Sequence, residues 1–145
     1  MRQRKAFLQF GPKSYGVSRT VPSSKPQAVF IVEDDRAVRD ALTLLVEDQG
    51  IAIAAFADGE SFLQNARPSD GDIVLLDLGL PDMDGELVAE LLRIRGCKCR
   101  IAVISGQRGA AFDRSVARVR PFAAFRKPLH IPSLLQTLSL GPARA

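Results

Sequence analysis

The chain has 145 residues, of which 46% are hydrophobic and 25% are charged, a composition typical of one folded domain with an ordinary core. Its longest apolar runs are strand-sized, which excludes a membrane span, and no signal peptide precedes them, so we expect a cytoplasmic protein. The cysteines Cys97 and Cys99 form a lone C-x-C that lacks the second ligand pair of a zinc site, and we expect them to be reduced.

The net charge of +4 is unevenly distributed along the chain. Residues 1–27 carry six basic side chains and no acid, whereas the remainder carries 14 Lys and Arg against 16 Asp and Glu, about −2. This segment is also rich in Pro, Gly and Ser, and it predicts a flexible basic extension. Attraction to an acidic partner, a membrane surface or nucleic acid is the alternative interpretation.

From residue 28 onward, short apolar runs alternate with segments of helical period. The pattern predicts strands at 28–33, 51–56, 72–77, 101–105 and 123–125. It predicts helices at 36–48, 59–66, 85–95, 109–120 and 132–140, followed by a short tail at 141–145. Asp58 is the expected N-cap of the second helix, and Gly50 ends the first. In the third helix we expect Leu87, Val88, Leu91 and Leu92 to face the core.

This alternation predicts an α/β fold, in which a five-stranded parallel sheet is covered by helices on both faces. In such sheets, functional groups gather at the carboxyl ends of the strands. The acids of residues 33–35 follow the first strand, and Asp77 ends the third. Ser105 ends the fourth strand, and Lys127 follows the fifth. We therefore expect these side chains to converge on one site.

The chemistry of these groups suits a divalent cation and a phosphoryl group. Carboxylates that share a cleft raise one another's pKa unless a cation compensates, and Mg²⁺ favours such oxygen ligands. Asp77 is the candidate nucleophile, which would attack phosphorus to give an acyl phosphate. Lys127 would neutralise charge on the phosphoryl oxygens, and Ser105 would donate a hydrogen bond to one of them.

Four stretches, VFIVEDD, DLGLPDMDG, VISG and AFRKP, occur in this order and resemble the receiver domain of bacterial two-component response regulators. The resemblance covers residues 28–140, and DLGLPDMDG is similar to the FixJ-like branch. It implies a flavodoxin-like sheet with strand order 2-1-3-4-5. It also implies a cis bond between Lys127 and Pro128, which X-Pro sequences permit.

The same resemblance assigns roles to individual residues. Asp77 would be the phosphoacceptor, and Mg²⁺ would be held by Asp34, Asp77 and the backbone carbonyl of Gly79. Glu33 would act on the metal through a water molecule. Phe125 stands where receivers carry a switch aromatic, and its alternative role is a plain core residue.

Three adjacent acids leave two choices for the metal-binding pair, Glu33 with Asp34 or Asp34 with Asp35. Arg39 lies four residues after the triplet, as the family arginine does, and it favours Glu33 with Asp34. Asp35 is then expected to be the N-cap of the first helix.

The resemblance implies that a sensor histidine kinase or phosphotransfer protein supplies the phosphoryl group. The output would pass to a downstream protein target or a homodimer, through the face formed by 109–120, 123–125 and 132–140. No direct nucleic-acid contact and no membrane span are expected, and the only catalysis expected is the domain's own phosphorylation and slow dephosphorylation.

Other classes remain as alternatives. The chain could be a phosphorylation-independent pseudo-receiver that docks other proteins, or the receiver portion of a longer DNA-binding regulator. A haloacid-dehalogenase-type phosphohydrolase needs a second acid two residues after the nucleophile, where this chain has Gly79. A flavodoxin needs a Ser/Thr-rich phosphate loop after the first strand, where this chain has acids.

Overall fold

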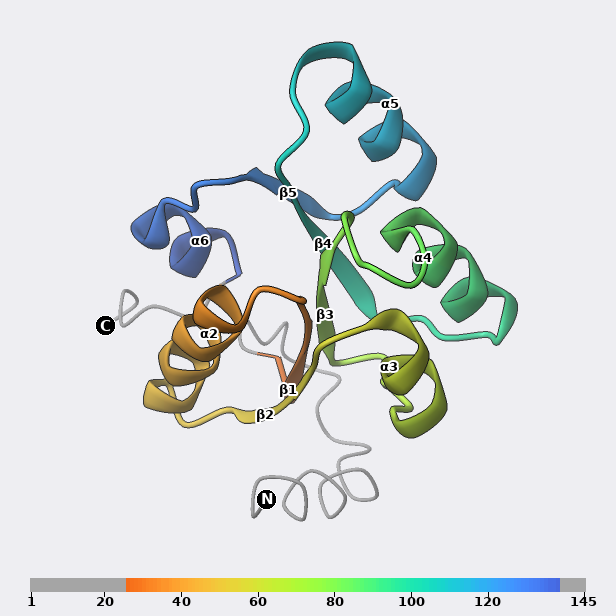
Figure 1. Ribbon diagram of the computed structural model, residues 1–145. Helices are drawn as coiled ribbons and strands as arrows, with labels where there is room; N and C mark the ends of the chain where they lie inside the picture. The colour runs from red at the N-terminus through yellow and green to blue at the C-terminus, as the bar shows by residue number, and fades with distance from the viewer. Residues whose placement is uncertain (1–25, 139–145) are drawn as a thin grey trace.

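The computed structural model describes residues 26–138 as an alternation of strands and helices (Figure 1). The strands are β1 (Ala28–Val32), β2 (Ala52–Phe56), β3 (Ile73–Asp77), β4 (Arg100–Ser105) and β5 (Ala123–Arg126). The helices are α2 (Arg36–Asp48), α3 (Gly59–Asn65), α4 (Gly85–Ile94), α5 (Gly109–Val119) and α6 (Ile131–Thr137). The basic extension over most of 1–27 and the tail at 141–145 lie outside the described residues.

All five strands are parallel, in the order β2-β1-β3-β4-β5. This confirms the predicted α/β class and strand order. Helices α2 and α6 cover one face of the sheet, whereas α3, α4 and α5 cover the other (Figure 1). Because parallel neighbours end at the same edge of a sheet, the residues that follow β1, β3, β4 and β5 share one edge.

The core has two layers, one on each face of the sheet, and strand β1 contributes to both. Phe30 and Val32 pack toward α3, α4 and α5, whereas Val29 and Ile31 pack toward α2 and α6. Every residue of β1 and β3 is buried. Strands buried on both faces have continuous apolar sequences, which is why these segments show no alternation.

Several helix ends behave as their sequences predict. The Asp35 carboxylate accepts a hydrogen bond from the Val38 amide at 3.2 Å, and Asp58 accepts one from the Ser61 amide at 2.8 Å. These contacts confirm both residues as N-caps. Gly50 follows α2 with a φ of 74°, a left-handed conformation that glycine adopts without strain.

The predicted inner face of α4 is right for Val88 and Leu92 but wrong for Leu87. Leu87 of α4 is 42% exposed, while Val88, Ala89 and Leu92 are buried against the sheet. The alanine completes the inward stripe, so the face is rotated away from Leu87. Other differences are small: β1 ends at Val32, so Glu33 follows the strand. The expected last helix residues, 139 and 140, lie outside the described residues.

Cys97 and Cys99 are free and partly buried. They precede β4 and therefore lie at the sheet edge opposite to that of Ser105. Within residues 26–138, no helix has both the length and the apolar character that crossing a membrane requires.

Candidate functional site

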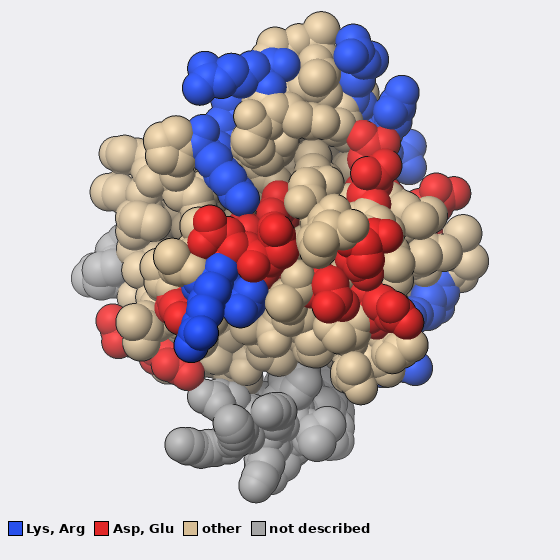
Figure 2. All heavy atoms as spheres, in the orientation of Figure 1, with Lys and Arg blue, Asp and Glu red and all other residues tan. Residues whose placement is uncertain are grey.

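The acids after β1 and β3 meet the lysine after β5 at the carboxyl edge of the sheet. Lys127 Nζ lies 3.1 Å from Glu33 Oε1 and 3.4 Å from Asp77 Oδ2. Figure 2 shows acidic side chains gathered near the middle of this face, with basic side chains beside them. The convergence expected from the strand ends is therefore found for these three residues.

Asp34 completes an acidic cluster with Glu33 and Asp77. One carboxylate oxygen from each residue lies within 4.8 Å of the others. Glu33 and Asp77 are buried, at 0% and 3% exposure, whereas Asp34 is exposed. The cluster thus has two fixed carboxylates at its base and one at the solvent side.

The buried acid Glu33 is only partly satisfied by its neighbours. Its Oε2 accepts hydrogen bonds from the Asp35 amide at 3.0 Å and from Lys127 Nζ at 3.3 Å. Among the described residues, Oε1 accepts no hydrogen bond, although it forms the 3.1 Å ion pair with Lys127. A buried oxygen with spare acceptor capacity beside two other carboxylates fits a hydrated divalent cation.

Electrostatics support the same conclusion. Burial raises the pKa of Glu33 from 4.5 to about 7; the Asp35 amide opposes this shift, and the Asp77 carboxylate reinforces it. For Lys127, burial lowers the pKa, but the charges of Asp77 and Glu33 outweigh it and the pKa is raised. The cluster holds three carboxyl groups and one lysine, which pairs with Glu33 and Asp77, so it has an excess of negative charge that a cation would relieve.

The backbone around the acids is held by Arg39. Its Nη1 donates to the main-chain carbonyl of Glu33 at 2.8 Å and to that of Asp34 at 3.2 Å. The arginine therefore fixes the main chain that carries both acids. Sequence reasoning used Arg39 only to align the acidic triplet and missed this contact, which its position one turn into α2 could have indicated.

Asp77 is anchored by the loop that follows it. Its Oδ1 accepts a hydrogen bond from the Gly79 amide at 2.9 Å. In the same loop, Asp82 accepts hydrogen bonds from the amides of Gly59 and Glu60 at 3.0 and 2.9 Å. These bonds tie the loop to the start of α3, a role for Asp82 that sequence reasoning did not identify. Asp82 lies within the DLGLPDMDG stretch, but its bonding partners are 23 and 22 positions away along the chain, so local patterns give no signal for these bonds.

Ser105 lies at the same edge but its hydroxyl is engaged elsewhere. The side chain is 1% exposed, and Oγ accepts a hydrogen bond from the Gln107 amide at 2.9 Å. Its main-chain carbonyl accepts from the Lys127 amide at 2.9 Å. Ser105 is thus next to the acidic cluster, with its hydroxyl bonded within its own loop.

Phe125 pairs with Ile104 in the sheet and packs, half-buried, on the α2 and α6 side of the core. Two residues later, the peptide bond between Lys127 and Pro128 is cis. The sequence permitted this bond, and the structure contains it.

The model of the response regulator receiver domain matches residues 29–139 of the chain. The chain belongs to this family. Curated relatives include the cell cycle response regulator CtrA of Brucella ovis and that of Brucella anthropi. Each is 35% identical over an alignment of 101 residues, with coverage of 65% of this chain and 44% of the relative. The chain therefore spans less than half of the length of these relatives.

Solved structures show the same fold. A response regulator from Colwellia psychrerythraea has a TM-score of 0.69 and 28% identity, with coverage of 81% of this chain and 95% of that chain. The BeF3-activated DrrB receiver domain has a TM-score of 0.70, with coverage of 79% and 95%, and at 18% identity it shows the fold alone. This receiver is thus a module of two-component signalling, while the FixJ-like branch stays a prediction.

Proposed function

We propose that this receiver accepts a phosphoryl group on Asp77 from a sensor histidine kinase or a phosphotransfer protein, with Mg²⁺ bound beside it. In this reaction, an Asp77 carboxylate oxygen forms a bond to phosphorus as the bond between phosphorus and the donor histidine nitrogen breaks. The observation that carries the proposal is the convergence of Asp77, Lys127, Glu33 and Asp34 at one sheet edge.

In this proposal, Asp34, Asp77 and the Gly79 carbonyl hold the cation, and Glu33 contacts it through water. When bound, Mg²⁺ supplies positive charge that neutralises phosphoryl oxygens and lowers repulsion from the acids. The 3.4 Å ion pair supports a role for Lys127 as a second source of positive charge. Gly79 already donates to Asp77, which holds one carboxylate oxygen in place.

In this proposal, phosphorylation of Asp77 would change the conformations of Ser105 and Phe125. Ser105 is bonded to Gln107 and would exchange this bond for one to a phosphoryl oxygen. Phe125 lies beside Ile104 in the neighbouring strand, so it is positioned to respond to a shift at the end of β4. The face formed by α5, β5 and α6 would then contact a downstream protein or a second copy of the domain.

Incubation with acetyl phosphate and Mg²⁺, followed by intact-mass measurement, tests this proposal. The wild-type chain should gain the mass of one phosphoryl group, and Asp77→Asn should gain none. Asp84→Asn is the matched control, because Asp84 is an exposed acid of the same loop whose side chain makes no capping hydrogen bond. Full labelling of Asp77→Asn, or no labelling of the wild type, would overturn the assignment.

A further inference from the structure

Helices α4 and α5 are joined by a partly buried polar contact that the proposed function does not use. Glu86, in the first turn of α4, accepts a 2.7 Å hydrogen bond from Ser115 Oγ through Oε2. Its Oε1 accepts one from Arg118 at 3.2 Å. Ser115 is only 4% exposed, so its hydroxyl depends on this carboxylate. We refer to Glu86, Ser115 and Arg118 as the Glu86 clasp.

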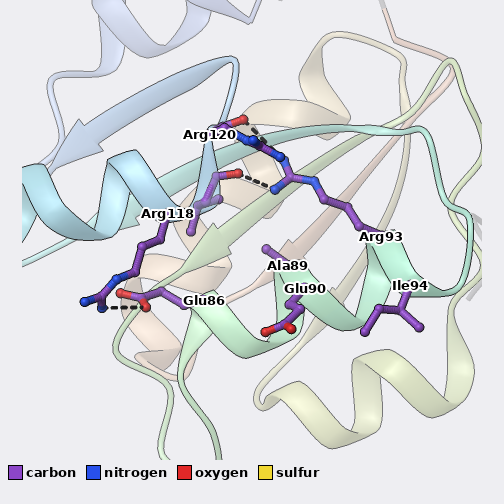
Figure 3. Close-up of a pocket in the computed structure, with 8 residues that line it drawn as sticks. Glu86, Ala89, Glu90, Arg93, Ile94, Arg118 and Arg120 are labelled. Atoms are coloured by element: carbon purple, nitrogen blue, oxygen red, sulfur yellow. Dashed lines mark hydrogen bonds and ion pairs between the residues drawn. The ribbon is translucent and has the colours of Figure 1, made fainter.

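A second polar contact joins the end of α4 to the end of α5. Arg93 of α4 donates hydrogen bonds to the main-chain carbonyls of Val119 and Arg120, where α5 ends (Figure 3). Between the two contacts lies a cavity of about 510 Å³, lined in part by Ala89, Glu90 and Ile94. These polar contacts hold the second half of α5 against α4, beside the core cluster to which Val119 and the buried apolar residues of α4 belong.

The α4 end of the Glu86 clasp is fixed relative to Asp77. Gly85 precedes Glu86, and a Cβ built on it would lie 2.7 Å from both the Asp77 carbonyl oxygen and Leu78 Cα. The Gly85 amide also donates to the Leu78 carbonyl at 3.2 Å. The start of α4 is therefore packed directly against the backbone of the candidate phosphoacceptor.

The clasp residues of α5, Ser115 and Arg118, lie in the second half of the helix, and the helix itself connects them to the loop that follows Ser105. Only residues 106–108 separate Ser105 from the first residue of α5. Within this short loop, the Gln107 amide is bonded to Ser105 Oγ at 2.9 Å. A movement of the Ser105 hydroxyl toward Asp77 must break this bond and pull on the start of α5.

We propose that Glu86 is a positioning residue, whose clasp holds α5 in the arrangement in which Ser105 is bonded to Gln107. The clasp thereby opposes the movement of Ser105 toward a phosphoryl group on Asp77. This inference rests on the proposed function, because the movement that the clasp opposes is the one that phosphorylation of Asp77 would drive. A contact present in one arrangement and lost in the other shifts the equilibrium by the difference in its free energy.

The test compares Glu86→Ala and Arg118→Gln with Glu90→Ala. Glu90 lies one turn further along α4 and lines the same cavity, but it is exposed and outside the clasp. Beryllofluoride with Mg²⁺ serves as the phosphoryl analogue, and isothermal titration calorimetry measures its affinity. Loss of the clasp should tighten binding by about three- to tenfold, whereas Glu90→Ala should bind as the wild type does.

Hydrogen exchange without beryllofluoride or Mg²⁺ gives an independent readout. Amides of α5 should exchange faster in Glu86→Ala, while those of α2 should be unchanged. Arg118→Gln replaces a side chain that is 65% exposed, so it keeps the test available if Glu86→Ala does not fold. Equal or weaker beryllofluoride binding by a folded clasp variant overturns the inference. Absence of binding by the wild type overturns the proposed function instead, and the exchange of α5 still tests the clasp.

Discussion

Lys127 and Asp77 are 50 positions apart in the sequence and form an ion pair of 3.4 Å between Nζ and Oδ2. The lysine also contacts Glu33, so a single ammonium group neutralises part of the charge of two buried acids. Its charge therefore competes with a bound cation and assists a bound phosphoryl group. These two effects have opposite signs and can be measured separately.

Replacement of Lys127 by Met should strengthen Mg²⁺ binding by several-fold, because the remaining acids lose their protein counter-charge. The same variant should incorporate phosphoryl groups from acetyl phosphate more slowly than the wild type. Calorimetric Mg²⁺ titration and time-resolved intact mass give the two values. Lys98→Met, a change at an exposed position of the segment before β4, is the control. Weaker Mg²⁺ binding by Lys127→Met would contradict the prediction.

Asp34→Ala and Asp35→Ala should have different effects although the residues are adjacent. Asp34 belongs to the acidic cluster, so its loss should reduce Mg²⁺ affinity by at least about tenfold. Asp35 caps α2, so its loss should lower the free energy of unfolding by about 1 kcal/mol and leave Mg²⁺ affinity nearly unchanged. Equal losses of affinity would show that the pair is not Glu33 with Asp34.

Glu33 should make stability depend on pH in the absence of divalent cations. Its pKa rises from 4.5 to about 7 on folding, so between these values the folded protein binds more protons than the unfolded chain. The contribution of Glu33 to the free energy of unfolding is therefore complete below about pH 4.5 and falls as the pH rises toward 7. Urea unfolding of the wild type and Glu33→Gln across this range measures the difference.

In that comparison, the wild type should lose stability relative to Glu33→Gln as the pH rises. Glu90→Gln, which changes an exposed carboxylate, should follow the wild type. If the difference between the wild type and Glu33→Gln stays constant over the range, Glu33 does not titrate as a buried acid.

Gly85→Ala should lower the free energy of unfolding by about 1–3 kcal/mol, because the added methyl group would meet two backbone atoms at 2.7 Å. Helix propensity alone predicts the opposite sign, since Ala is favoured over Gly by about 1 kcal/mol. A Cβ on Gly106 has no heavy atom within 4 Å, so Gly106→Ala should be neutral within about 0.5 kcal/mol. Thermal and urea unfolding of the two variants separate packing from propensity.

The order of elements and the composition of the site could be predicted from local patterns. Continuous apolar runs marked the buried strands, and Asp35 and Asp58 marked helix starts through their capping preference. The convergence of Asp77 and Lys127 followed from the rule that parallel strands end at one edge. These inferences depend only on residue types and their spacing along the chain, and both can be read directly from a sequence.

Other features depended on how the elements pack. The apolar residue Leu87 was expected in the core, but α4 turns it to solvent and buries Ala89 instead. Ser115 carries no sequence signal for burial, because the carboxylate that accepts its hydrogen bond is 29 positions away along the chain.

The sequence by itself thus determined the strands, their order through family resemblance, and the acids, serine and lysine at their ends. Only the tertiary structure decided the pKa of Glu33, which is raised by burial and by the nearby Asp77 carboxylate. It also decided which helices hold one another, as Glu86 shows with Ser115 and Arg118. Burial and side-chain contact depend on distances between segments remote in the chain, and local patterns contain no such distances.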